Sequence, residues 1–187
     1  MYELFILGEL MDKPTHGYLL QYVLDKVIGP NRKLSWGVLY PLIQRMTEEG
    51  YVKQILDEEG GRGRPRKIIS LTDKGRVRFH HLMEESIPYD QTAEDTFDIK
   101  VSNFHHVRKE VQQVILEQFE GYLYFLLKHL DDNHAIITDN DAISKYEKRS
   151  IERVLQRRRE KLDAELNWVH NELQMIKEDL NHESDRT

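Results

Sequence analysis

The stretch Tyr51-Val52-Lys53-Gln54-Ile55-Leu56, followed further along by Arg66-Lys67-Ile68-Ile69-Ser70-Leu71, decides the fold of this chain. Both runs are rich in aliphatic and β-branched residues and have the length of strands. The intervening Asp57-Glu58-Glu59-Gly60-Gly61-Arg62-Gly63-Arg64-Pro65 contains the glycines and the proline that mark a turn. The sequence therefore predicts a β-hairpin with a long basic tip.

Helical periodicity predicts three helices before this hairpin and one after it. The first covers Tyr2–Met11, the second follows a cap at Thr15, the third runs from Ser35 to Gly50, and the fourth follows Thr72-Asp73. This order is that of a winged helix-turn-helix, whose third helix enters the major groove of DNA while the hairpin reaches the adjacent backbone or minor groove. We expect a mainly α fold with a small β-hairpin.

The third helix has one apolar and one hydrogen-bonding face. We expect a bend or a restart at Pro41, which lies inside this helix. The expected buried stripe consists of Val38, Leu39, Leu42, Ile43 and Met46, and the expected outward face of Gly37, Tyr40, Gln44 and Arg45.

Candidate DNA contacts lie on this helix, just before it, and in the hairpin. Arg pairs well with guanine and Gln with adenine in the major groove, whereas the hydroxyl of Tyr40 is expected either to reach a phosphate or to prop the helix against the wing. The candidate DNA-binding residues are Arg32, Lys33, Ser35, Trp36, Gly37, Tyr40, Gln44, Arg45, Arg62, Arg64, Arg66 and Lys67.

The rear half of the chain is expected to be long antiparallel helices. After Gly121 the sequence contains neither glycine nor proline. We expect residues 1–86 to form the DNA-binding domain, 87–93 a linker, and 94–187 a helical domain for dimerisation and possible effector binding. A turn is expected after Asp131-Asp132-Asn133, and a capped start of the last helix at Thr138–Asp141.

The last helix carries a coiled-coil-like seam. Its apolar positions step by sevens, fours and threes, and nearly all intervening residues are charged or amide. Such a seam must pack either on another chain, which predicts a homodimer, or on the preceding helices. The candidate dimerisation residues are Leu155, Leu162, Leu166, Val169, Leu173, Ile176 and Leu180.

Composition places the chain among cytoplasmic proteins rather than membrane proteins. Of its 187 residues 39% are hydrophobic and 32% charged, and it has no cysteine. No stretch approaches the roughly 20 apolar residues of a spanning helix, and the N-terminus lacks the basic start of a signal peptide. The net charge of −6 arises in the rear half, so it does not argue against a nucleic-acid partner of the front half.

The residues give no sign of catalysis, cofactor or metal. We find no nucleophile–base pair and no phosphate-binding glycine loop, so an enzyme is not expected. The pairs His80-His81 and His105-His106 lack a further ligand at metal-site spacing, and neighbouring histidines on a helix point to different sides. We therefore expect no metal site.

Six short motifs together resemble the PadR family of bacterial transcriptional regulators. The looser similarity of Glu94–Lys100 and of the Trp168-bearing last helix extends to the long C-terminal domain of the first PadR subfamily. The motifs are Ile6-Leu7-Gly8, Pro14-Thr15-His16-Gly17-Tyr18, Gly37-Val38-Leu39-Tyr40-Pro41-Leu42, Glu49-Gly50-Tyr51-Val52, Gly63-Arg64-Pro65-Arg66-Lys67 and Leu71-Thr72-Asp73-Lys74-Gly75.

The resemblance implies a homodimeric repressor, released from a palindromic operator by a small effector such as a phenolic acid or a toxic aromatic compound. Aromatic residues able to line an effector pocket are Trp36, Phe97, Phe104, Phe119, Tyr122, Phe125 and Trp168, although most are expected in the core. The alternative is a winged-helix protein-interaction module that acts through its coiled coil. Such a module would not need the cluster of positive charges in the wing.

Overall fold

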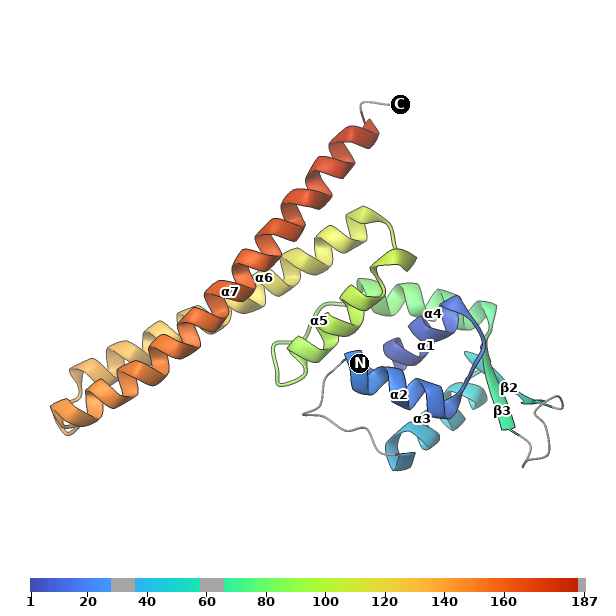
Figure 1. Cartoon of the computed structure of the whole chain (residues 1–187), viewed down its shortest axis with the longest axis horizontal. Coiled ribbons are helices and arrows are strands. Elements are labelled where there is room, and N and C mark those ends of the chain that lie inside the picture. The colour runs from blue at the N-terminus through green and yellow to red at the C-terminus, as the bar shows by residue number, and fades with distance from the viewer. Residues whose placement is uncertain (28–35, 58–65, 185–187) are drawn as a thin grey trace. The chain divides into compact units, whose positions relative to one another are not determined.

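The computed structural model describes residues 1–27, 36–57 and 66–184 (Figure 1). The chain forms two compact units, Met1–Gln112 and Gln113–Thr187. Segment 87–93, which the sequence suggested as a linker, lies within the first unit. The functional roles assigned to residues 1–86 and 94–187 stay predictions.

Within its described residues, the first unit combines six helical segments with a small sheet. Its order, helix, helix, helix, strand, strand, helix, agrees with the sequence prediction apart from a short strand, β1, that was not expected. The elements are α1 (Tyr2–Asp12), β1 (Thr15–His16), α2 (Gly17–Val27), α3 (Trp36–Glu48), β2 (Val52–Asp57), β3 (Arg66–Leu71), α4 (Asp73–Glu84), α5 (Ala93–Ser102) and the 3₁₀ turn η1 (Phe104–His106).

The sheet is antiparallel, with strand order β1-β3-β2. The predicted hairpin is present, and its pairing runs from Val52 opposite Leu71 to Asp57 opposite Arg66. On the other side of β3, Thr15 pairs with Ile69. The expectation that Thr15 caps a helix is therefore wrong, because its backbone pairs in the sheet and α2 begins at Gly17.

The core of the first unit is built around α1. Leu4, Phe5, Ile6 and Leu7 are consecutive and all buried, because other elements cover this helix on several sides. α1 contacts α2, α4, α5 and β3. The remaining core includes Leu20, Leu24, Leu39, Ile43, Met46, Phe79, Leu82, Met83, Phe97 and Ile99.

Hydrogen-bonded caps end α3 and begin α4, the two helices on either side of the wing. Gly50 has φ +76°, the left-handed conformation predicted for the end of α3. The Tyr51 N–H donates to Met46 O over 2.9 Å and the Gly50 N–H to Thr47 O over 3.1 Å, which together make a Schellman motif. At the start of α4, the Thr72 hydroxyl accepts a hydrogen bond from the Gly75 N–H, as expected of an N-cap.

The second unit is a pair of long helices, α6 (Lys109–Asp139), whose first residues belong to the first unit, and α7 (Lys145–Ser184). The pair is antiparallel, because Asp131 forms an ion pair with Arg159 whereas the earlier Glu120 pairs with the later His170. The prediction of a turn after Asp131-Asp132-Asn133 is wrong, since α6 continues for six more residues, to Asp139.

The start of the last helix also differs from the expectation. The chain turns at Asn140, whose side chain accepts a hydrogen bond from the Ala142 N–H, and the N-cap of α7 is Ser144. Ser144 accepts from the N–H of Glu147, three residues later, in the spacing of a capping box. Thr138–Asp141, the predicted cap, instead includes the end of α6.

The heptad seam of α7 is largely buried within the chain itself. Val169 is fully buried, Leu155, Leu166, Leu173 and Ile176 are nearly so, and Leu162 and Leu180 are half-buried. The sequence left two partners for the seam, another chain or the preceding helices. Packing within the chain accounts for the burial of most seam residues. No helix in the described residues is long and apolar enough to cross a membrane.

Candidate nucleic-acid interface

The recognition helix of this fold, α3, exposes one continuous face. Gly37, Tyr40, Pro41 and Gln44 follow helical spacing and are all exposed. The opposite side, Leu39, Ile43 and Met46, is buried. This matches the predicted outward face, and α3 is a single helix that does not restart at Pro41.

The predicted buried stripe of α3 needs two corrections. Val38 is 48% exposed and Leu42 is only half-buried. The core-facing positions of α3 are Leu39, Ile43 and Met46, which are four and three residues apart. They occupy a narrower part of the helix surface than the five predicted residues would. Val38 therefore lies beside the outward face and adds apolar surface to it.

Gln44 and Arg45, the candidates for base contacts, both have protein partners. The Gln44 amide donates to Glu48 Oε1 over 3.0 Å, along the same helix face. The Arg45 guanidinium donates to Glu3 Oε2 of α1 over 3.3 Å and lies 3.7 Å from Glu49 Oε1. Arg45 must leave Glu3 before it can reach a base.

Tyr40 is the largest side chain of the outward face. It is 54% exposed. A hydroxyl on this face can reach a phosphate without displacing core side chains.

The described part of the wing presents Lys67 to solvent on β3. Its carbonyl oxygen lies 3.2 Å from His16 Nδ1, a contact that ties the hairpin to β1. On β2, Ile55 and Leu56 are 52% and 57% exposed. The wing therefore combines a cation with an apolar surface.

Seven of the twelve predicted DNA-binding residues lie wholly or partly outside the described residues. Five of them fall outside the described residues entirely: Arg32, Lys33, Ser35, Arg62 and Arg64. Trp36 and Arg66 lie in α3 and β3 by their backbone, and their side chains are not described. Gly37, Tyr40, Gln44, Arg45 and Lys67 are all exposed.

Glu3 is a site residue that sequence reasoning missed. It has a 16% exposed side chain in the first turn of α1 and faces cations of α3 and α4. Its partners are 42 and 75 residues away in sequence, so no local spacing could have indicated them.

The exposed helix and the hairpin beside it define a winged helix-turn-helix DNA-binding protein. Residues 6–81 match the sequence profile of the Transcriptional regulator PadR-like family. The first unit therefore contains a domain similar to this family of DNA-binding transcriptional regulators, and the whole match lies within that unit.

Several solved structures are similar to the chain. Bacillus subtilis PadR in complex with operator DNA is 19% identical, with 93% of this chain and 98% of that chain covered and a TM-score of 0.44. A PadR-like transcription factor from Bacteroides fragilis is 26% identical over 43% of this chain and 74% of its own, with a TM-score of 0.39.

A PadR family transcription regulator from Clostridium difficile R20291 is 22% identical over 57% of this chain and 98% of its own, with a TM-score of 0.37. No curated protein matches the chain.

Proposed function

We propose that the chain is a homodimeric repressor that binds a palindromic operator through α3 and the wing, and that a small aromatic effector releases it. The observation that carries this proposal is the exposed face of α3, which includes Tyr40 and Gln44, on a helix that contacts strand β2 of the hairpin. In such dimers two recognition helices enter successive major grooves about 34 Å apart.

The roles of the contacts are divided between helix and wing. Gln44 and Arg45 supply base contacts, because only side chains on the groove-facing helix can read base edges. The wing and the segment before α3 supply phosphate contacts, which position the protein. The proposed interface comprises Arg32, Lys33, Ser35, Trp36, Gly37, Tyr40, Gln44, Arg45, Arg62, Arg64, Arg66 and Lys67.

The helical unit is the proposed dimerisation element. The seam of α7 forms the core of that unit, and exposed apolar neighbours on the same helix, Trp168 (40%) and Met175 (51%), are placed to contact a second copy. Sedimentation velocity should give twice the chain mass of 22.3 kDa. A monomer at micromolar concentration would exclude the dimeric repressor.

The effector is proposed to be a small aromatic compound such as a phenolic acid. Phe97, Phe119 and Tyr122 are buried and serve the core, whereas Phe125 and Trp168 are about half exposed. An effector releases the operator only if it binds the free protein more tightly than the DNA complex. Equal affinity of the effector for both forms would contradict this part of the proposal.

The decisive experiment is a fluorescence-anisotropy titration of the full chain into the duplex upstream of its own gene, with a scrambled duplex as reference. We expect tight binding to the native duplex alone, with affinity that falls steeply as salt rises. Equal binding to both duplexes would overturn sequence-specific regulation. Absence of binding would favour the protein-interaction module.

A charge-matched pair of variants locates the interface. Replacing Arg62, Arg64, Arg66 and Lys67 together by Ala should abolish binding and reduce the salt slope. The control replaces four exposed lysines of the helical unit, Lys128, Lys145, Lys161 and Lys177, by Ala. Both variants lose four positive charges, so only a local effect of the wing can separate them.

A further inference from the structure

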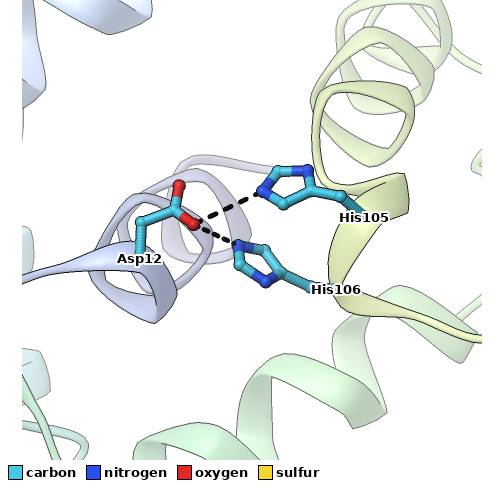
Figure 2. A group of neighbouring side chains, drawn as sticks. All are labelled: Asp12, His105 and His106. Atoms are coloured by element: carbon cyan, nitrogen blue, oxygen red, sulfur yellow. Dashed lines mark ion pairs between the residues drawn. The ribbon is translucent and has the colours of Figure 1, made fainter.

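Three side chains with metal-binding groups meet in the first unit. Asp12 is the last residue of α1, and His105 and His106 belong to η1 (Figure 2). Asp12 Oδ1 lies 3.5 Å from His105 Nε2 and 3.3 Å from His106 Nε2. One ligand atom from each residue lies within 4.8 Å of the other two.

The histidine pair does not have the geometry that its sequence suggests. On an α-helix neighbouring side chains diverge by about 100°, but in η1 the two rings lie close together, with centroids 3.9 Å apart. Both rings face Asp12, 93 residues earlier in the chain (Figure 2). The expectation of no metal site rested on local spacing, which cannot report this contact.

His106 supplies an unsatisfied buried atom. Its side chain is 12% exposed, and its Nε2 is buried without a hydrogen-bond partner within the described structure. The ring packs edge-on against Phe79, with centroids 5.8 Å apart.

An ion pair alone is a poor explanation of this arrangement. Two protonated imidazoles with ring centroids 3.9 Å apart would repel each other, and a single carboxylate is there to compensate them. The Nε2 of His106 lies 3.3 Å from Asp12 Oδ1 but has no hydrogen-bond partner, so its bonding capacity is not satisfied. A cation placed between the three groups would satisfy this nitrogen and the carboxylate together.

The distances fit a small transition-metal ion. Zinc binds imidazole nitrogen at about 2.0–2.1 Å and carboxylate oxygen at about 2.0–2.2 Å. Ligand atoms at these lengths around a tetrahedral ion are roughly 3.3–3.5 Å apart. The two distances from Asp12 Oδ1, 3.3 and 3.5 Å, fall in this range.

The surroundings contribute charges of both signs. Glu9, one turn before Asp12, has a pKa raised by burial and then by Asp12. The guanidinium of Arg76 lies 3.7 Å from the Sδ atom of Met11, the residue before Asp12. Glu9 therefore adds negative potential for a cation, and Arg76 partly offsets it.

We propose that Asp12, His105 and His106 bind one divalent transition-metal ion of the zinc type. Imidazole donors suit Zn²⁺, Ni²⁺ and Co²⁺ and do not suit Mg²⁺ or Ca²⁺. Three protein ligands leave a fourth position open for water. The bound ion links the end of α1 to η1, which precedes the start of α6 by two residues.

The test is isothermal titration calorimetry of ZnCl₂ into the full-length, tag-free chain. We expect one Zn²⁺ site per chain, unaffected by excess Mg²⁺. Asp12→Asn and His105→Gln should each weaken it by about 10-fold or more, since even outer-shell changes cost that much. Both side chains are 57% exposed, so these variants should fold as the parent does.

A matched control separates this site from adventitious binding to surface histidines. His129→Gln/His134→Gln removes two exposed histidines of α6, and His170→Gln removes a histidine that pairs with Glu120 over 2.8 Å. Both variants should bind Zn²⁺ as the parent does. Absence of a site in the parent, or equal losses in control and site variants, would overturn the proposal.

A second readout does not depend on calorimetry. Co²⁺ bound by two imidazoles and a carboxylate gives visible d–d absorption, which should appear in the parent and vanish in His105→Gln/His106→Gln. An unchanged spectrum in that variant would equally refute the assignment. Neither measurement involves DNA, so failure here leaves the proposed repressor untouched, and failure of DNA binding leaves this site untouched.

Discussion

Glu3 Oε1 accepts a hydrogen bond from Arg78 Nε over 2.8 Å, which joins the first turn of α1 to α4. This bond raises the pKa of Arg78. The other oxygen of Glu3 holds Arg45. One carboxylate thereby couples the stability of the domain to the availability of a candidate DNA-reading side chain.

We predict that Glu3→Gln lowers the free energy of unfolding by about 1–2 kcal/mol, because hydrogen bonds to charged groups contribute more than neutral ones. Urea unfolding followed by circular dichroism measures this. The exposed acidic residue Glu84, replaced by Gln, is the control and should change little. Equal stability of the two variants would contradict the coupling.

The same Glu3→Gln variant should bind operator DNA more tightly, since Arg45 is released and one negative charge is removed near the interface. The gain should shrink with added salt. Anisotropy titrations at low and high salt measure it. Glu3→Gln/Arg45→Ala should lose most of the gain; if it does not, Arg45 is not the group that Glu3 restrains.

Gly75→Ala should destabilise the winged domain by about 1–3 kcal/mol, as overpacking does. A Cβ at Gly75 would lie 2.1 Å from the Tyr51 carbonyl oxygen and 2.7 Å from Leu71 Cδ1. Thermal unfolding should show the loss. Val77→Ala, at a 71% exposed position of the same helix, should stay within about 0.5 kcal/mol of the parent.

Lys100 should make stability depend on alkaline pH. It is 1% exposed, and its ammonium donates to the carbonyl oxygens of Met83 and Glu85 at the end of α4. Burial lowers the pKa of Lys100 from 10.5 to about 8, with Glu85 opposing the shift. Below pH 8 both the folded and the unfolded chain carry the proton, and the folded chain bears the cost of a buried cation.

Between pH 8 and 10.5 the unfolded chain keeps the proton of Lys100 and the folded chain loses it, so unfolding takes up a proton and the unfolding free energy rises with pH. The parent should gain on the order of 1–3 kcal/mol relative to Lys100→Met across this range. Urea unfolding at pH 7.5 and 10.5 tests this. A constant difference between the two proteins would contradict the lowered pKa.

Val169→Ala should destabilise the helical unit by about 1–3 kcal/mol, because Val169 is fully buried within a single chain. Met175→Glu, at an exposed position of α7, should instead weaken dimerisation and leave helix content intact. Circular dichroism and sedimentation velocity separate these effects. If Val169→Ala dissociated a stably folded dimer, the seam would belong to the interface between chains.

The sequence predicted the winged domain well because its signals are local. Gly50 ends α3, Thr72 begins α4, and the two strands differ from their predicted bounds by at most one residue at each end. Each of these features depends on residues within a few positions of one another. The sequence also predicted the outward face of α3, since a 3.6-residue period assigns opposite sides to Tyr40 and Ile43.

The errors have physical causes as well. Thr15 resembles a helix cap, but pairing with Ile69, 54 positions later, outweighs that local preference. Asp131-Asp132-Asn133 resembles a turn, but α6 continues through it because ion pairing with Arg159 and burial of Leu130 favour the helix. The capping box from Ser144 to Glu147 is a local sequence signal. The predicted cap, Thr138–Asp141, lies in the polar segment just before it.

Pairing of β3 on both sides has a consequence for solubility. In the described sheet β2 is the long strand with an open outer edge, and it carries exposed Ile55 and Leu56. Edges of this kind template strand addition between molecules, and charged residues such as Lys53 oppose it. Without DNA at the wing, concentrated protein should therefore self-associate first along this edge. Replacement of Lys53 should then speed aggregation on storage before it lowers the stability of the fold.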